Sequence, residues 1–290
     1  MNLAQTVLGL NRVVARSVGK VVRHRGLTRR VIGLFREARV VDPVFMDGVR
    51  FLMELWPQDP IDFMLHYDGC YERAEGELFC ELVRPGQTVL DVGAHAGYYT
   101  LAAARSVGES GRVHAFEPSE TNFARLRRNV ELNGLTNVAL NKVAMSDREG
   151  EAAMYLSAED PGQHSLGRVG EVSAECVVPT VTLDGYVAKS GLARLDMVKI
   201  DVEGAETMVL RGGREVLARD RPSLLIEINE VRLRSLASSG SELLGVLREL
   251  GYEVEVIVGG ARRPPEGKIR EFCNAYAFPA GRNQGAPSGK

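Results

Sequence analysis

The most restrictive feature of this 290-residue sequence is a regular alternation of short apolar segments with longer amphipathic ones, which begins after residue 86. Apolar segments of strand length occupy residues 88–92, 112–116, 137–143, 196–201 and 223–228. Segments with a helical pattern occupy residues 97–107, 119–133, 203–219 and 239–250. Strands that alternate with helices form mostly parallel sheets with helices on both faces, so the sequence predicts an α/β fold of that kind.

The last two predicted strands, residues 252–258 and 273–278, have no helical pattern between them. Such a pair adds one antiparallel strand at the C-terminal edge of a parallel sheet. We therefore expect a Rossmann-like sheet of seven strands, mostly parallel, with an antiparallel C-terminal edge strand. Residues 144–182 interrupt the alternation and are interpreted as an insertion over one end of the sheet.

The alternation also suggests how the chain is divided. Residues 1–40 precede it as a basic segment, in which apolar residues recur at spacings of three and four over residues 3–38 and predict an amphipathic helix. Residues 41–84 form a lead-in region, residues 85–280 the main domain, and residues 281–290 a tail predicted to be disordered.

The charge of the chain is distributed unevenly. Residues 1–40 contain nine basic residues and one acidic residue, so they carry +8, and the other 250 residues carry −10 of the net charge of −2. An acidic body excludes an extended nucleic-acid surface. A basic amphipathic helix either lies on an anionic membrane surface or packs on protein, including a second copy of the chain.

Other features limit the location of the chain. The four cysteines form no C-x-x-C pair, and neither a zinc site nor a disulfide framework is indicated. The sequence shows no uncharged apolar run of spanning length and no signal-peptide pattern. We expect a cytoplasmic protein, with peripheral contact at the inner face of the membrane as the alternative that the basic helix leaves open.

The stretch TVLDVGAHAGYYTLAAA indicates a nucleotide-type ligand site. It places Asp91 in a strand, Gly93 and Gly97 in the turn, and a helix directly after. Glycines let a backbone approach a ligand closely, and a helix N-terminus offers free N–H groups. Twenty residues after Gly97 the next strand ends at Glu117, where a carboxylate accepts hydrogen bonds from ribose hydroxyls.

The glycine pattern discriminates between two cofactors. A dinucleotide site needs G-x-G-x-x-G, whereas the residues from Gly93 are G-A-H-A-G. An acid before the first glycine and a terminal strand pair favour S-adenosylmethionine instead. In that interpretation the glycine loop faces the methionine half, Glu117 holds the ribose, and the loop Ala144-Met145-Ser146-Asp147 lies beside the adenine.

Several segments together resemble the FkbM-type S-adenosylmethionine-dependent methyltransferases. They are LHYDGCYERAEGELFCELVRPGQTVLDVGAHAGYYT, VAMSDREGEAAMY, VKIDVEGAETMVLRGG, LLIEI and NAYAFP, in order, over roughly residues 65–279. The resemblance implies a class I methyltransferase fold and methyl transfer mostly to oxygen, on hydroxyls of natural products, sugars or glycolipids. It leaves open a nitrogen acceptor, and a cofactor-binding regulator or assembly factor without catalysis.

The resemblance also implies a set of cofactor-binding residues. His95 departs from the pattern, because many relatives have Asn there; its ring can still donate to the cofactor, so we include it. The set is Asp91, Gly93, Ala94, His95, Gly97, Glu117, Ser146 and Asp201. For Asp91 and Glu117 the alternatives are a structural acid at a strand end and a helix N-terminal acid.

The junction VKIDVEGAE supplies candidate catalytic residues. Asp201 follows a strand and reaches the carboxyl edge of the sheet, where it either binds the cofactor or accepts the acceptor proton. Glu203 falls in the first turn of the predicted helix 203–219, where it is a second candidate or a cap. Mg²⁺ held by Asp201, Glu227 and Asn229 is an alternative, but no local carboxylate cluster demands a metal, and none is predicted.

Three further residues complete the predicted site. His164 in PGQHSLG is a second candidate base, because it lies in the insertion that would cover the substrate, although an exposed loop histidine is the simpler alternative. Tyr67 and Glu72 lie in the segment before the first strand of the alternation. The resemblance implies that they line the acceptor pocket, and for Tyr67 a role in packing is an equal alternative.

Overall fold

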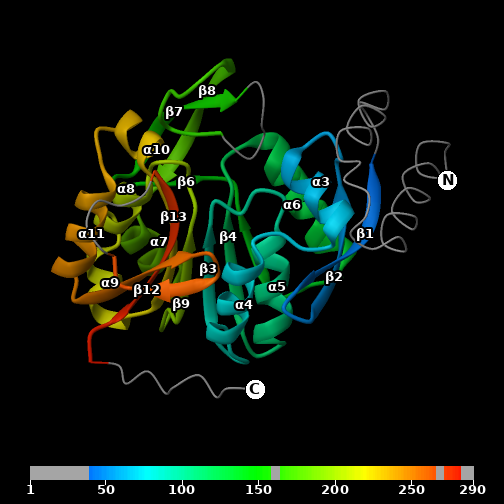
Figure 1. Ribbon diagram of the computed structural model, residues 1–290, viewed down its shortest axis with the longest axis horizontal. Helices are drawn as coiled ribbons and strands as arrows, with labels where there is room; N and C mark the ends of the chain where they lie inside the picture. Colours follow the sequence, from blue (N-terminus) through cyan, green and yellow to red (C-terminus); the bar gives the residue numbers. More distant parts are fainter. Residues whose placement is uncertain (1–38, 158–163, 266–270, 282–290) are drawn as a thin grey trace.

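The computed structural model describes residues 39–157, 164–265 and 271–281 (Figure 1). Its centre is one sheet of eight strands in the order β12-β11-β13-β10-β9-β3-β4-β5. Strands β5, β4, β3, β9 and β10 are parallel to one another. The strands are β3 (Thr88–Val92), β4 (Arg112–Phe116), β5 (Val138–Asn141), β9 (Met197–Ile200), β10 (Ser223–Asn229), β11 (Tyr252–Val258), β12 (Ala261–Arg263) and β13 (Phe272–Pro279).

The predicted α/β class and mostly parallel sheet are confirmed, but the number and order of strands differ from the prediction. Strand β12 adds an eighth strand, which has three exposed residues and no apolar signal in the sequence. The antiparallel strand β13 lies between β10 and β11 rather than at the edge. Its central residues Ala275 and Ala277 are fully buried there, whereas an edge position would expose them.

The central strands β3 and β9 contribute to two separate cores because alternate side chains point to opposite faces. Val89 and Met197 belong to one core and their neighbours Leu90 and Val198 to the other. The first face is covered by α3 (Pro60–Asp68), α4 (Arg73–Leu82), α5 (Tyr98–Val107) and α6 (Glu120–Leu132). The second is covered by α7 (Leu183–Ser190), α8 (Glu206–Arg211), α9 (Arg214–Asp220) and α11 (Gly240–Glu249).

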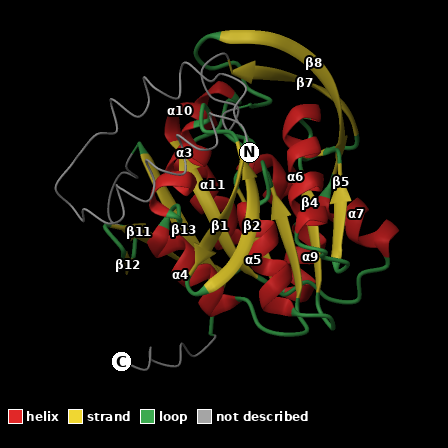
Figure 2. Ribbon diagram, turned by 90° about the vertical axis from the view of Figure 1, so that its right-hand side faces the viewer, coloured by secondary structure: helices red, strands yellow, loops and turns green. Residues whose placement is uncertain are grey.

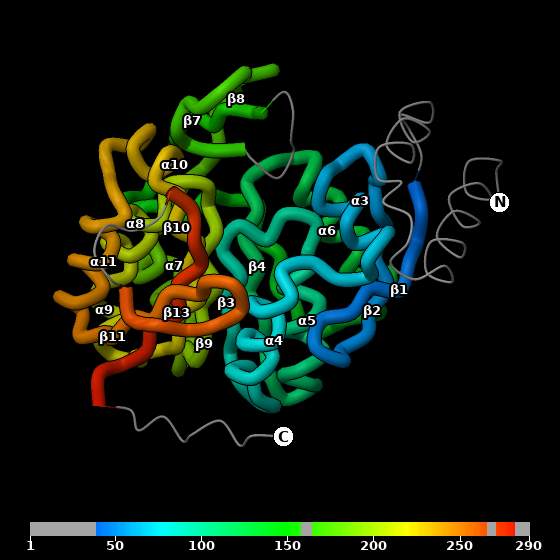
Figure 3. Tube along the Cα trace, viewed as in Figure 1, coloured from blue at the N-terminus to red at the C-terminus, as the bar shows by residue number. Residues whose placement is uncertain are grey.

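The lead-in region packs on the first of these faces. A two-stranded hairpin of β1 (Val40–Met46) and β2 (Val49–Leu55) lies outside α5 and α6 (Figure 3). On α6 the side chains of Asn129 and Asn133 accept hydrogen bonds from the backbone N–H groups of Glu54 and Leu52, at 2.7 and 2.9 Å. These contacts fix the hairpin, and with it the start of α3, against the main domain.

Residues 144–182 include a separate three-stranded sheet. It consists of β6 (Ala144–Met145), β7 (Gly150–Ser157) and β8 (Val172–Val181), in the order β6-β8-β7. In Figures 1 and 2 the strands β7 and β8 extend above the central sheet. Between β7 and β8, His164 and Ser165 line the pocket that is described in the next section.

The predicted helix over residues 203–219 is two helices, α8 and α9, interrupted at Gly212 and Gly213. A Cβ at Gly212 would lie 2.2 Å from the backbone oxygen of Ser146, so the close approach of the β6 loop breaks the helix. The short helix α10 (Glu230–Ser235) was not predicted.

Two predictions cannot be compared with the structure, because the basic helix over residues 3–38 and the tail from residue 282 lie outside the described residues. No helix among the described residues has the length and apolar character that spanning a membrane requires.

Candidate active site

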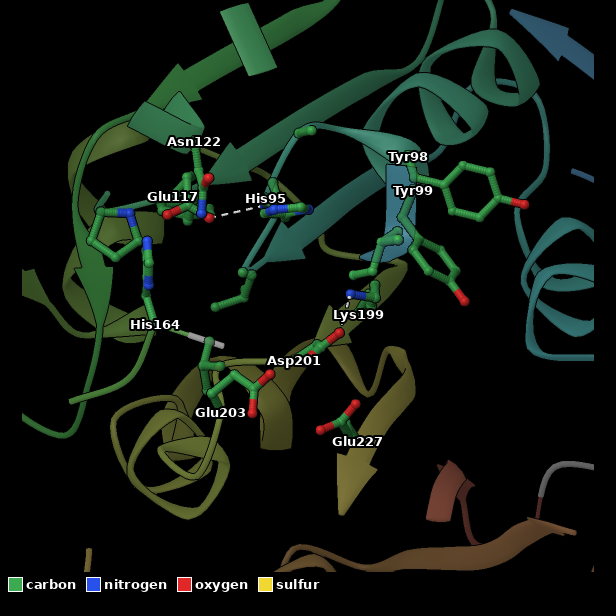
Figure 4. Close-up of a pocket in the computed structure, with 18 of the residues that line it drawn as sticks. His95, Tyr98, Tyr99, Glu117, Asn122, His164, Lys199, Asp201, Glu203 and Glu227 are labelled. Carbon is green, nitrogen blue, oxygen red and sulfur yellow. Dashed lines mark hydrogen bonds and ion pairs between the residues drawn. The ribbon is translucent and has the colours of Figure 1, made fainter. Parts of the chain in front are cut away.

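A pocket opens at the carboxyl ends of β3, β4, β9 and β10 (Figure 4). From β3 the chain adds β4 and β5 on one side of the sheet, and it then adds β9 and β10 on the other side. Open α/β sheets bind ligands at the point where the strand order reverses in this way, here between β3 and β9. The lead-in region and the residues after β7 close the pocket from the sides. In Figure 4, Glu117, Asn122 and His95 gather at one end of the pocket, and Lys199, Asp201 and Glu227 at the other.

The glycine loop after β3 is shaped by two close approaches. Gly93 has φ +88, and a Cβ there would lie 1.7 Å from the backbone oxygen of Asp201. Gly97 has φ +99 and begins α5, where a Cβ would lie 2.8 Å from Leu126 Cδ1. Gly93, Ala94 and His95 line the pocket, whereas Gly97 shapes the loop from behind. Only glycine fits both turns, since other residues are strained at positive φ and their Cβ has no room.

Glu117 is buried at the end of β4 and holds the loop in place. Its Oε2 accepts from the backbone N–H of His95 at 2.9 Å, and its Oε1 accepts from that of Ser119 at 2.8 Å. Burial raises the pKa of Glu117, and His95 opposes this effect. Each carboxylate oxygen has a second lone pair, so Glu117 can accept from the two hydroxyls of a ribose, as the sequence predicts.

Besides Gly97, two of the predicted cofactor residues do not line the pocket. Asp91 is fully buried beneath it, where its Oδ2 accepts from the Thr100 hydroxyl at 2.5 Å. Burial raises the pKa of Asp91, and Lys199 on the adjacent strand opposes the shift. Ser146 is also buried and lies outside the pocket, although its neighbours Ala144 and Met145 line it.

Lys199 is a central residue of the site that the sequence reading missed. Its Nζ lies 3.0 Å from Asp201 Oδ2 and 4.6 Å from the centre of the Tyr99 ring. Burial alone would lower the pKa of Lys199, but Asp201, Asp91 and Glu72 raise it above its ordinary value. The sequence signal that could have identified Lys199 is its position as the single cation in the apolar strand MVKI. A cation buried there needs anions around it.

Asp201, Glu203 and Glu227 form a compact acidic group at this end of the pocket. Their nearest carboxylate oxygens all lie within 4.8 Å of one another, close enough to surround a cation. Lys199 pairs with Asp201, and Arg232 Nε lies 3.3 Å from Glu203 Oε2. Burial raises the pKa of Glu227 well above its ordinary value, and Asp201 and Glu203 add to the effect.

The structure corrects two assignments near this group. Glu203 does not belong to a helix: it has φ +55 in the loop before α8, and the acid in the first turn is Glu206. Glu206 Oε1 accepts from the backbone N–H groups of Val202 and Gly204, at 3.1 and 3.0 Å. Asn229 does not join the acidic group, because its Oδ1 caps α10 by accepting from the N–H of Arg232.

His164 lines the pocket, as predicted, but its hydrogen bonding argues against a role as a base. Its Nδ1 accepts from the backbone N–H of Ser157 at 3.1 Å. Burial lowers the pKa of His164 to about 4, and the nearby His95 contributes. The ring is therefore neutral at pH 7 with its hydrogen on Nε2, which can donate to a ligand but cannot take a proton.

The two predicted acceptor-pocket residues have different positions. Glu72 lines the pocket and accepts a hydrogen bond from the Tyr99 hydroxyl at 2.9 Å. Tyr67 does not line it; its ring stacks on Phe63 of the same helix, with centroids 5.9 Å apart.

A buried charge cluster, also missed, anchors α3 to the cofactor loop. Arg125 of α6 binds both Asp59, at 2.9 Å, and Asp62. His95 Nε2 lies 3.4 Å from Asp59 Oδ2. Burial would raise the pKa of Asp59, but His95 and Arg125 hold it far below its ordinary value. For Asp62 burial prevails and raises the pKa to about 6, although Arg125 opposes the shift.

Comparison with known proteins gives a consistent picture. Residues 91–254 match the family described as Methyltransferase FkbM domain. The chain is 30% identical over 217 residues to the 31-O-demethyl-FK506 methyltransferase FkbM of Streptomyces tacrolimicus, covering 64% of this chain and 78% of the relative. It is 28% identical to the 2-O-methyltransferase NoeI of Sinorhizobium fredii over 155 residues, covering 48% of this chain and 63% of the relative.

Among solved structures, a methyltransferase FkbM from Methylobacillus flagellatus is 16% identical and aligns with a TM-score of 0.42. The alignment covers 76% of this chain and 55% of that chain.

Proposed function

We propose that this chain, which belongs to the FkbM family of S-adenosylmethionine-dependent methyltransferases, methylates a hydroxyl oxygen on a sugar, glycolipid or natural product. The observation that carries the proposal is the polarity of the pocket. One end presents Glu117 for a nucleoside, and the other presents four acids: Glu72, Asp201, Glu203 and Glu227. A positively charged methyl donor with a ribose fits that arrangement.

The residues present fit S-adenosylmethionine. Its contribution is a methyl group made electrophilic by the positive sulfonium. Glu117 can hold the ribose, and Gly93 lets the loop backbone approach the methionine half. The four acids face only two cations, Lys199 and Arg232, among the described residues, so the acidic end has an excess of negative charge. That excess stabilises a cationic ligand.

The proposal of an oxygen acceptor is supported by two relatives. The names of the Streptomyces and Sinorhizobium relatives specify O-methylation. A hydroxyl is a weak nucleophile until its proton leaves, and the acidic end offers carboxylates that can take it. The rest of the catalysis comes from holding the oxygen in line with the methyl group.

We propose no metal for this reaction. Asp201 and Glu203 are each paired with a basic side chain, so they are not free to surround a divalent ion without giving up those pairs. Mg²⁺ is the alternative, and loss of activity in EDTA with recovery in Mg²⁺ would support it.

The test is methyl transfer to extracts from cells that lack the gene. Purified protein and S-adenosylmethionine should add the mass of one methylene group to a metabolite or glycolipid, and a donor with a trideuterated methyl should give the matching heavier product. Fragmentation of the product locates the methyl group. The variant Glu117→Ala, which removes the ribose acceptor, is the inactive control, with its folding checked by thermal melting.

Three outcomes separate the candidate functions. A product with its methyl group on oxygen supports the proposal. A product methylated on nitrogen contradicts the choice of acceptor atom. Binding of S-adenosylmethionine in calorimetry, without a product in any extract, contradicts catalysis and favours a regulator.

A further inference from the structure

The Tyr71–Glu72 segment, between α3 and α4, brings an acid over the pocket in a strained conformation. Glu72 has φ +43 and ψ +60, in the left-handed region that residues other than glycine rarely adopt. It occupies the N-cap position of α4 but makes no capping hydrogen bond with its side chain. The side chain instead turns into the pocket, where it meets the Tyr99 hydroxyl. Strain of this kind persists where the surroundings enforce it, and it is frequent at functional sites.

Two consecutive tyrosines at the start of α5 enforce this conformation. The Tyr98 hydroxyl accepts from the Tyr71 N–H at 3.2 Å and lies 3.1 Å from the Tyr71 carbonyl oxygen. The Tyr99 hydroxyl donates to Glu72 Oε2 at 2.9 Å. Both tyrosines follow Gly97 directly, so one short segment holds the cofactor loop on one side and Glu72 on the other. The position of Glu72 is therefore coupled to that of the cofactor loop.

The pairing of the four acids distinguishes Glu72 from the others. Asp201 and Glu203 are paired with Lys199 and Arg232. Burial raises the pKa of Glu227 well above its ordinary value, and Asp201 and Glu203 add to the rise. Within the described residues Glu72 forms no ion pair, and its hydrogen bond comes from a neutral phenol.

The groups around Glu72 place its titration near neutrality. They are the adjacent Tyr71, Tyr99 of α5, Lys199 of β9, Asp201 after β9, Glu75 of α4 and Glu227 of β10. Burial raises the pKa of Glu72 to about 7, Asp201 adds to the rise, and Lys199 and Tyr99 oppose it. A base whose pKa lies near the working pH is both unprotonated and strong enough to take a proton.

We propose that Glu72 is the general base, taking the proton of the acceptor hydroxyl during methyl transfer. The inference rests on the proposed function. The acceptor oxygen bonds to the methyl carbon, the carbon–sulfur bond breaks with its electron pair going to sulfur, and the hydroxyl proton passes to the Glu72 carboxylate. The products are a methyl ether, a neutral thioether and a carboxylic acid that returns its proton to solvent.

The first experiment needs no acceptor. Carbon-13 NMR of protein labelled at the glutamate carboxyl carbons follows each titration, and the signal lost in Glu72→Gln identifies Glu72. Its midpoint should lie at about 7, and Tyr99→Phe should raise it further because the charged form loses a hydrogen bond. A midpoint near the ordinary 4.5 overturns the proposal whatever the activity.

The second experiment measures turnover with the acceptor extract and S-adenosylmethionine. Glu72→Gln should lower kcat roughly 100- to 10,000-fold and leave the affinity for S-adenosylhomocysteine within about twofold. Glu72→Asp should recover part of the loss because it restores a carboxylate. Glu77→Gln, at an exposed position on α4, is the matched control and should leave kcat unchanged.

The two experiments separate the two proposals. If Glu72→Gln turns over as fast as the wild-type protein, the role of Glu72 is wrong and the proposed function stands. If the wild-type protein methylates nothing, the proposed function fails, and the NMR midpoint still decides whether Glu72 titrates where a base is needed. Thermal melting of each variant identifies a loss of kcat that comes from unfolding.

Discussion

Gly93 is the residue at which the cofactor loop and the loop after β9 come closest. Its neighbourhood rules out a side chain for two reasons: its φ is +88, and a Cβ would lie 1.7 Å from the backbone oxygen of Asp201. Gly48, in the β1–β2 turn, has a similar φ of +81 with nothing within 4 Å of its Cβ position. Comparing the two glycines separates backbone strain from steric exclusion.

We expect Gly48→Ala to cost about 1–2 kcal/mol of unfolding free energy, the ordinary penalty of a left-handed alanine. Gly93→Ala should cost more and should abolish binding of S-adenosylhomocysteine, because Asp201 and the loop must separate to admit the methyl group. Urea denaturation and calorimetry measure the two effects. Equal affinity for S-adenosylhomocysteine in both variants would contradict the role of this contact.

At single residues the sequence predicted residues that line the pocket better than the residues that position them. Gly93 and Glu117 were found because a glycine turn and a strand-end acid are spaced as a nucleoside requires. The partners of Lys199 were not found, because register between β3 and β9 is a property of the sheet and not of either strand. Glu203 was placed in a helix because sequence periodicity does not reveal a left-handed residue before α8.

The elements themselves were predictable where apolar residues recur along a short strand. Strands β3, β4 and β11 appear at the predicted residues because their pattern is uninterrupted. The split of α8 from α9 was not predictable, since it depends on the backbone of Ser146, which comes from a distant part of the sequence. Strand β12 is three exposed residues long and carries no pattern at all.

The attachment of α3 to α6 depends on Arg125. This side chain is 4% exposed and bridges Asp59 and Asp62, two buried acids at the start of α3. Arg128, one turn along α6, makes a looser pair with Glu54 at 3.6 Å, and its side chain is 54% exposed. The two arginines provide a buried and an exposed ion pair on the same helix.

Replacing Arg125 with Met should lower the unfolding free energy by about 3–5 kcal/mol, because two buried carboxylates lose their shared partner. Arg128→Met should cost less than about 1 kcal/mol. Denaturation at pH 7 and pH 5 checks the reason as well as the size, since unpaired acids can take protons at pH 5 and the loss should shrink there. A loss that is equal at both pH values would exclude unpaired charge as its cause.

Across the whole molecule, the acids around the pocket make folding depend on pH. Burial raises the pKa of Glu72 and Glu206 to about 7 and that of Asp62 to about 6. Each acid stabilises the fold fully below its pKa in the unfolded chain, which is about 4.5 or less. This stabilisation is lost as pH rises through the pKa of the acid in the folded protein. His114 and His164 act in the opposite direction. Burial lowers their pKa values, so their contribution to the stability of the fold is lost as pH falls below 6.5.

The acids outnumber these histidines, since burial also raises the pKa values of Asp91, Glu117 and Glu227. We therefore expect a larger unfolding free energy in urea at pH 5 than at pH 7. Glu206→Gln should reduce that difference by up to about 1.4 kcal/mol per pH unit, whereas Glu253→Gln, at an exposed position on β11, should leave it unchanged. Greater stability at pH 7 than at pH 5 in the wild-type protein would mean that these acids are ionised in the fold, and that the pocket tolerates more negative charge than its burial allows.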